Sequence, residues 1–291
     1  MEKQAVCIQC HKNPDYINEL IELFPREKFD IFIHMDKKSG VIIPDIIHGD
    51  HIHFVPEEKR IDVGWGRFSQ VEATLAMMDM FTPEEYGYVH LISGEDAPVK
   101  SPNEIYEFLA KDDKEYIQSF PILPTKGWRD NWQSRYLVRY PAWMVDRRTN
   151  TVKRTIRIFY REFVLRTGIG KRKDLPAATI FGGSQWFSLT GKCVQWIMEY
   201  IHTHEEFMTF FHSALCPDEM VFNTIVRYSP FAEHIANTPA RFMIWEGSKT
   251  GGPLTLKREQ ISLMRGEDHN FFARKVSDVD TLRAIKDEIW K

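Results

Sequence analysis

The sequence AVCIQCHKNPDYINELIELFPREKFDIFIHMD, residues 5–36, contains two short apolar runs separated by an amphipathic segment. Residues 6–9 predict a buried strand, residues 16–24 a helix with one apolar face, and residues 30–36 a second strand. This β-α-β opening continues into a strand at residues 51–55, which argues for a parallel sheet with crossover helices. The sequence therefore predicts an α/β fold.

Composition sets the class of protein. The chain has 291 residues, of which 43% are hydrophobic and 27% are charged, enough for a full core in one large domain or two small ones. Its net charge of −3 gives no global attraction to nucleic acid or to anionic membranes. The N-terminus lacks a secretory apolar core, and no window approaches eighteen apolar residues. We expect a cytoplasmic protein, soluble or peripheral on the inner membrane face, without a nucleic-acid partner.

The cysteines do not predict a metal or redox site. Only Cys7, Cys10, Cys193 and Cys216 occur, too few and too scattered for a disulfide framework. Cys7 and Cys10 form a C-x-x-C within a predicted strand, where residues three apart point to opposite faces. No second C-x-x-C completes a four-cysteine zinc site.

Three polar segments follow predicted strands and are expected to contact substrate. They are the loop after Gln9, the segment 34–36 and the segment 93–96, which follows a strand at residues 88–92. In an open α/β sheet, ligands bind outside the carboxyl ends of the parallel strands. We therefore expect these segments to meet at one edge of the sheet.

Two acids begin a predicted helix at Cys216-Pro217-Asp218-Glu219, downstream of an apolar strand-like run at residues 181–187. Proline is favoured at the first helical position, which places Asp218 and Glu219 in the first turn. There they complement the helix dipole, worth roughly 0.3–1 kcal/mol, or one of them faces a cleft. On these residues alone, the favoured interpretation is that both acids complement the helix dipole.

Basic residues dominate residues 147–173, where they alternate with apolar ones. A basic amphipathic helix is the simplest interpretation. Such a helix lies on an anionic membrane, binds phosphates, or packs its apolar side on the protein body. We expect one domain over residues 1–291, with an accessory basic helical subregion around residues 125–175.

Four separated blocks carry a resemblance to a known family. The blocks are WGRFSQVEA at 65–73, YVHLISGEDAPVKS at 88–101, GSQWF at 183–187 with PDE at 217–219, and FFARK at 271–275. In this order and spacing, and with the opening His-Lys and Ile-His-x-Asp patterns, the chain resembles the core-2/I-branching N-acetylglucosaminyltransferase and peptide O-xylosyltransferase family. The resemblance implies a GT-A-like fold, a Rossmann-like mixed sheet flanked by helices.

The resemblance also implies inverting transfer of a sugar from a UDP-sugar donor to an acceptor hydroxyl. Single displacement needs a carboxylate base, and the base of the family matches Glu219. The departing diphosphate needs neutralisation, and Arg274 and Lys275 match a phosphate-binding position of the family. The strand ending in His34-Met35-Asp36 has one acid where metal-dependent GT-A enzymes have D-x-D, so no metal or other cofactor is expected.

Further site residues are expected from the same resemblance. On the donor side these are His11, His34 and Asp36, with Lys257 or Arg258 substituting for a family basic residue that should lie near Leu254. Sugar and acceptor contacts are expected from Trp65, Glu95, Asp96, Arg135, Trp186 and Asp218. The alternatives are that both tryptophans are core residues and that Glu95 and Asp96 accept hydrogen bonds from neighbouring backbone N–H groups.

The predicted function is therefore a glycosyltransferase that acts on a glycan or a lipid-linked acceptor, as in assembly of a surface polysaccharide. With a lipid-linked acceptor, residues 147–173 would dock the protein on an anionic membrane surface. Two other hypotheses stay open. One is a glycoside hydrolase with paired carboxylates such as Glu95 and Glu219. The other is a sugar-binding protein with a decayed active site, consistent with the lost basic residue near Leu254. The donor sugar is not predicted.

Overall fold

The structure is a computed structural model that describes residues 2–41, 43–123, 132–145, 151–245, 252–266 and 269–290. Arg147 and Arg148, the first two cations of the predicted basic helix, lie outside the described residues.

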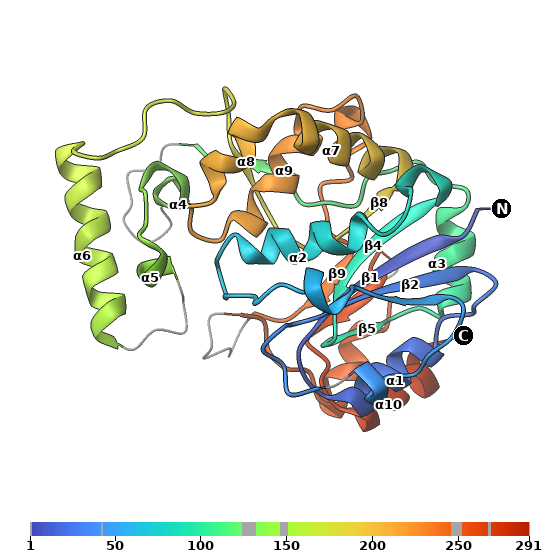
Figure 1. The fold of residues 1–291 in the computed structure, drawn as a ribbon. Helices are drawn as coiled ribbons and strands as arrows, with labels where there is room; N and C mark the ends of the chain where they lie inside the picture. The colour runs from blue at the N-terminus through green and yellow to red at the C-terminus, as the bar shows by residue number, and fades with distance from the viewer. Residues whose placement is uncertain are drawn as a thin grey trace.

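A five-stranded sheet forms the centre of the described chain (Figure 1). Its order is β3 (Ile52–Phe54), β2 (Phe29–Met35), β1 (Gln4–Cys10), β4 (Tyr88–Ser93) and β8 (Phe187–Thr190). The first four strands run parallel, and β8 is antiparallel to β4. The predicted α/β class is confirmed, with one antiparallel edge strand that makes the sheet mixed.

Helices cover both faces of this sheet and continue into a lateral extension (Figure 1). The α-helices are α1 (Pro14–Glu22), α2 (Ser69–Met78), α3 (Pro102–Leu109), α4 (Gln133–Leu137), α5 (Ala142–Val145), α6 (Thr151–Thr167), α7 (Gly191–Thr203), α8 (Glu205–Phe211), α9 (Val221–Arg227) and α10 (Val279–Ile289). The 3₁₀ helices are η1 (Ile43–Asp45), η2 (Glu57–Lys59), η3 (Pro83–Glu85), η4 (Pro217–Glu219), η5 (Ala232–His234) and η6 (Arg258–Met264).

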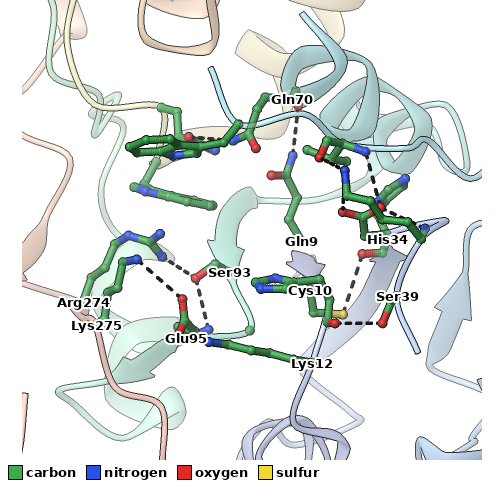
Figure 2. Close-up of a pocket in the computed structure, with 18 of the residues that line it drawn as sticks. Gln9, Cys10, Lys12, His34, Ser39, Gln70, Ser93, Glu95, Arg274 and Lys275 are labelled. Atoms are coloured by element: carbon green, nitrogen blue, oxygen red, sulfur yellow. Dashed lines mark hydrogen bonds and ion pairs between the residues drawn. The ribbon is translucent and has the colours of Figure 1, made fainter. Parts of the chain in front are cut away.

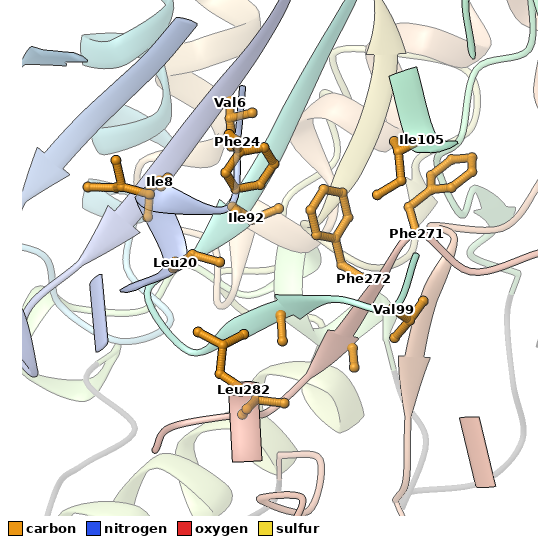
Figure 3. Close-up of a cluster of buried hydrophobic side chains, with 14 of the residues drawn as sticks. Val6, Ile8, Leu20, Phe24, Ile92, Val99, Ile105, Phe271, Phe272 and Leu282 are labelled. Carbon is orange, nitrogen blue, oxygen red and sulfur yellow. The ribbon is translucent and has the colours of Figure 1, made fainter. Parts of the chain in front are cut away.

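Strand β1 separates two hydrophobic clusters. Val6, Ile8 and Cys10 belong to the cluster that also contains apolar residues of α1 and α10, part of which Figure 3 shows. Ala5 and Cys7 belong to the cluster on the other face, with residues of α2 and α7. Because both faces of the sheet are buried at β1, the sequence of this strand is a nearly continuous apolar run. The predicted opposite orientation of Cys7 and Cys10 is confirmed, and both thiols are free and buried.

A second sheet joins segments that are far apart in the sequence. Its order is β5 (Asp96–Pro98), β10 (Phe272–Arg274) and β9 (Arg241–Met243). Strand β10 is antiparallel to β5, with Arg274 opposite Asp96. This pairing brings the FFARK block of the C-terminal region beside the SGED block that ends β4.

The prediction of a strand-like run at residues 181–187 is wrong for the middle of this segment. Strand β7 (Phe181–Gly182), which pairs with β6 (Phe120–Pro121), ends at Gly182, and β8 begins only at Phe187. Between them, the side-chain amide of Asn223 donates hydrogen bonds to the carbonyls of Ser184, at 3.0 Å, and of Gln118, at 2.6 Å. Side-chain hydrogen bonds thus take the place of a sheet ladder in this segment.

The lateral extension consists of α4, α5 and α6. Val164 of α6 packs into a small cluster with Val138, Tyr140, Met144 and Val145, separate from the two main clusters. A helix within the predicted basic stretch is confirmed, although it spans only Thr151–Thr167. None of the helices in the described ranges is long and apolar enough to cross a bilayer. The division into one domain with an accessory subregion stays a prediction.

Candidate active site

A pocket of about 410 Å³ lies at the carboxyl ends of β1, β2 and β4 (Figure 2). All three segments that follow these strands contribute to its wall, which confirms that they meet at one edge of the sheet. Eight of the predicted site residues line it: His11, His34, Asp36, Trp65, Glu95, Trp186, Arg274 and Lys275. The pocket is therefore the candidate binding site.

One carboxylate holds two lysines together at this pocket. The Nζ of Lys12 lies 2.9 Å from Oε1 of Glu95, and the Nζ of Lys275 lies 3.6 Å from Oε2 of Glu95 (Figure 2). Burial alone would raise the pKa of Glu95, but the hydrogen bond from Lys12 and the charges of Lys275 and Arg274 bring it below its ordinary value. Burial and the neighbouring Arg274 lower the pKa of Lys275. The cluster thus combines one acidic side chain with two lysines, next to Arg274, so basic side chains outnumber acidic ones here.

Arg274 is held rigidly beside this cluster. Its guanidinium lies 2.6 Å from Oδ1 of Asp96, donates a hydrogen bond to Oγ of Ser93, and stacks 4.2 Å from the ring centre of Trp186. Strand β10 supplies Arg274 and the end of β4 supplies Ser93. The packing leaves the side chain few alternative rotamers, so its charge is fixed at the pocket wall.

These contacts correct the expectation for Asp96. Its side chain is 0% exposed and also accepts a hydrogen bond from the N–H of Ser93 at 2.9 Å, so it does not reach a sugar hydroxyl. The alternative interpretation, an acid that binds backbone N–H groups, describes Asp96 better. Trp186 is buried and Arg274 covers one of its ring faces, yet it lines the pocket, so its sugar contact stays a prediction.

The end of β2 is tied to the loop that carries Trp65. Burial lowers the pKa of His34 to about 4, and its Nε2 accepts a hydrogen bond from the N–H of Ile61 at 2.9 Å. Oδ1 of Asp36 accepts hydrogen bonds from the N–H groups of Lys38, at 3.1 Å, and Val63, at 3.4 Å. His34 is therefore neutral near pH 7 and supplies no positive charge to a phosphate.

Glu219 lies in η4, next to this pocket, and forms an ion pair with Arg135. The side chain of Glu219 is 29% exposed, and Arg135, also stacked 3.6 Å from the ring centre of Trp132, is 20% exposed. Asp218, by contrast, is only 6% exposed. The predicted placement of Asp218 and Glu219 in a first helical turn is confirmed, although the turn is 3₁₀ and α9 follows it.

Two backbone hydrogen bonds fix η4 against the pocket wall. The N–H of Cys216 donates to the carbonyl of Gly66 at 2.9 Å, next to Trp65. The N–H of Gly183 donates to the carbonyl of Glu219 at 3.0 Å, two residues before the pocket-lining Gln185. Neither Glu219 nor Arg135 lines the pocket itself. The two backbone hydrogen bonds place η4, which carries Glu219, at the border of the pocket.

Gly183 is required by close packing in this arrangement. A Cβ at this position would lie 2.0 Å from the carbonyl oxygen of Gln118, a backbone atom that cannot rotate away. We expect Gly183→Ala to lower the free energy of unfolding by about 1–3 kcal/mol, measured by urea denaturation. The matched control is Gly87→Ala, whose Cβ would meet nothing closer than 3.9 Å. Equal stability of the two variants would contradict this account.

Lys257 and Arg258 do not join the pocket, which corrects their expected donor-side role. Lys257 pairs with Asp278, the N-cap residue of α10, at 3.0 Å, and Arg258 pairs with Glu288 of α10 at 3.0 Å. The segment near Leu254 nevertheless lies beside Lys275, because the N–H of Leu256 donates to the carbonyl of Lys275 at 2.7 Å. The family position is thus beside the site, but this chain has leucine there.

Sequence reasoning missed two cations at the pocket, Lys12 and Lys38. Lys12 directly follows the predicted His11 in the loop after β1, so its position at a strand end was an available signal. Lys38 contributes through the loop after β2, where its Nζ lies 2.6 Å from Oδ1 of Asp62. Lys12 supplies positive charge that the residues near Leu254 lack.

The described residues do not present a set of metal ligands. No group of three His, Cys, Asp or Glu side chains within the described ranges is arranged to hold a metal ion. The two carboxylates that line the pocket are engaged, Glu95 by two lysines and Asp36 by backbone N–H groups.

Comparisons with known proteins agree with the resemblance. The family model of the Core-2/I-Branching enzyme matches residues 18–268, a range that contains Glu219 and ends before Arg274. Xylosyltransferase 2 of Rattus norvegicus is 24% identical over 241 residues, covering 79% of this chain and 25% of that protein. Xylosyltransferase 2 of Bos taurus is 23% identical over 249 residues, covering 80% and 26%.

The chain thus spans about a quarter of the length of the curated relatives that it matches. The family match, by contrast, covers most of the chain, including β2, β4, β8 and η4. The expected α/β architecture with a mixed sheet is present as well. The chain therefore belongs to the Core-2/I-Branching enzyme family of glycosyltransferases, with a GT-A-like fold.

Proposed function

We propose that the protein transfers a sugar from a UDP-sugar to a hydroxyl group of a glycan or lipid-linked acceptor, with inversion at the anomeric carbon. The observation that carries the proposal is the arrangement at one sheet edge. A pocket with the cations Lys12, Arg274 and Lys275 lies beside η4, the segment that carries the partly exposed carboxylate of Glu219. The cations suit a diphosphate, and the carboxylate suits a proton acceptor.

In the proposed reaction, the acceptor oxygen attacks the anomeric carbon while the bond from that carbon to the β-phosphate oxygen breaks. Glu219 takes the proton of the acceptor hydroxyl, and the bonding electrons leave with UDP. Arg274 and Lys275 stabilise the negative charge that develops on the leaving diphosphate. Arg135 acts as a positioning residue, because its ion pair orients the carboxylate of Glu219.

A nucleotide titration tests the donor side of this proposal. We expect UDP to bind in the presence of EDTA, and more tightly than GDP or CMP, in calorimetric titrations of the full chain. The reason is that protein cations, rather than a metal, would neutralise the diphosphate. Binding that requires manganese would keep the transferase but assign the diphosphate to a metal near Asp36.

Two results would overturn the proposed function. No nucleotide binding in either condition would favour the glycoside hydrolase or the sugar-binding protein. UDP binding without transfer from any UDP-sugar tested would favour a decayed active site. A screen of UDP-sugars with glycan and lipid-linked acceptors separates these outcomes and identifies the donor.

A further inference from the structure

Helix α6 exposes an apolar stripe to solvent. Val152, Ile156, Phe159 and Phe163 follow the 4-3-4 spacing that places side chains on one helical face. All four are exposed, with Phe159 at 70% and Phe163 at 51%. The stripe covers eleven residue steps, about 17 Å along the helix axis. Contiguous exposed apolar side chains of this kind mark an interaction surface.

An adjacent side of α6 already holds the helix on the protein. Val164 is buried in the small cluster with Met144, a guanidinium nitrogen of Arg157 donates to the carbonyl of Met144 at 3.0 Å, and the hydroxyl of Tyr160 donates to the carbonyl of Arg139 at 3.1 Å. Figure 1 shows α6 at the outer end of the extension, away from the central sheet. The stripe is therefore available without any change in the fold.

The charge around this stripe is strongly positive. Residues 151–173 contain eight lysines and arginines and a single acid, Glu162, a formal charge of +7 in a chain whose net charge is −3. Lys153, Arg154 and Arg166 on the helix are exposed, as are the lysines at 171 and 173 that follow it. An anionic phospholipid bilayer is complementary to this surface, because its charged headgroups can pair with the cations while its acyl chains accept the apolar side chains.

We propose that α6 lies in the plane of an anionic phospholipid bilayer, with Val152, Ile156, Phe159 and Phe163 inserted at the boundary between headgroups and acyl chains. Anionic headgroups then meet the surrounding cations. A second copy of this chain is the weaker occupant, because it would bring two surfaces of like charge together. The inference does not depend on the proposed transferase reaction.

Vesicle flotation of the full chain tests this surface. We expect binding to vesicles of phosphatidylcholine mixed with phosphatidylglycerol, weak binding to phosphatidylcholine alone, and release by high salt. Phe159→Ser/Phe163→Ser should bind about tenfold more weakly or worse. Lys171→Glu/Lys173→Glu should lose roughly fivefold for each cation removed. The matched control is Leu263→Ser, which replaces a 56% exposed apolar side chain on η6 and should bind like the unchanged protein.

A single label locates the inserted face. All four native cysteines are buried, so Phe159→Cys adds the one accessible thiol among the described residues. An environment-sensitive fluorophore at this position should shift to shorter wavelength with anionic vesicles, whereas the same label at Leu263→Cys should not. Far-UV circular dichroism and urea denaturation of each variant report whether its fold is intact.

Four results would overturn the proposal: no vesicle binding, equal binding to neutral vesicles, unchanged binding of the double Phe variant, or equal shifts at both labels. A dimer in solution that the double Phe variant dissociates would assign the stripe to a second copy instead. All of these results leave the UDP titration unaffected, so failure here is distinguishable from failure of the proposed function.

Discussion

Replacing Glu219 by Gln is expected to reduce sugar transfer by roughly a hundredfold to ten-thousandfold, the range found for removal of a general base. Glutamine preserves the shape of the side chain but cannot take the proton of the acceptor hydroxyl. UDP affinity should be unchanged, because Glu219 stands at the border of the pocket and not among the residues that line it. Initial rates with a UDP-sugar and calorimetric titration of UDP measure the two effects separately.

The stability of this variant provides a control. Loss of the Arg135 ion pair, which is partly exposed on both sides, should cost about 1 kcal/mol or less in the free energy of unfolding. Glu206→Gln, a substitution of an exposed acid in the first turn of α8, should leave transfer unchanged and cost at most roughly 0.3–1 kcal/mol in the free energy of unfolding, the contribution of an acid at a helix start. Near-normal transfer by Glu219→Gln would eliminate Glu219 as the base.

Arg274→Met should damage both stability and donor binding. Asp96 is fully buried, and removal of its cation leaves an uncompensated charge, which typically costs about 3–5 kcal/mol in the free energy of unfolding. Affinity for UDP should fall as well, because the pocket loses its most rigidly held cation. Urea denaturation and UDP titration at a temperature where the variant is folded measure the two losses.

Lys275→Met is the matched comparison, since it removes the neighbouring cation from the same wall. Its partner Glu95 keeps Lys12, so stability should change little, whereas UDP affinity should fall. Asp96→Asn/Arg274→Met should regain part of the lost stability without regaining UDP affinity, because the buried charge is gone but the phosphate contact is not restored. Wild-type UDP affinity in both Arg274→Met and Lys275→Met would refute their assignment to the diphosphate.

The β-α-β opening was predictable because local pattern and tertiary environment agree there. Strands buried on both faces read as apolar runs, and α1 carries its apolar residues at helical spacing. The position of the pocket followed from topology alone, because parallel strands that follow one another present their carboxyl ends at one edge. The candidate base, by contrast, came only from the family resemblance, since the proline at the start of η4 predicts no more than that the next two acids lie in its first turn.

Partnerships across long sequence distances were not predictable. Asp96 looked available to substrate, but the antiparallel pairing of β5 with β10 places Arg274 opposite it. The same pairing lets Arg274 cover a face of Trp186. Lys257 and Arg258 are close to Lys275 in sequence, yet they pair with acids of the C-terminal region, on or next to α10. Only the register of distant segments decides which charges face the pocket.

The lysine pair around Glu95 has a consequence for turnover. Glu95 serves as the counter-ion of Lys12 and Lys275, so the positive charges of these two lysines are already balanced in part within the protein. In the proposed reaction, the diphosphate of an entering nucleotide must compete with the carboxylate of Glu95 for the two lysines. When the diphosphate leaves, Glu95 again neutralises the lysines, and no ion from solution is needed. Product release often limits the rate of such enzymes. Glu95 would thus set a ceiling on how tightly the spent nucleotide is retained, in favour of repeated catalytic cycles.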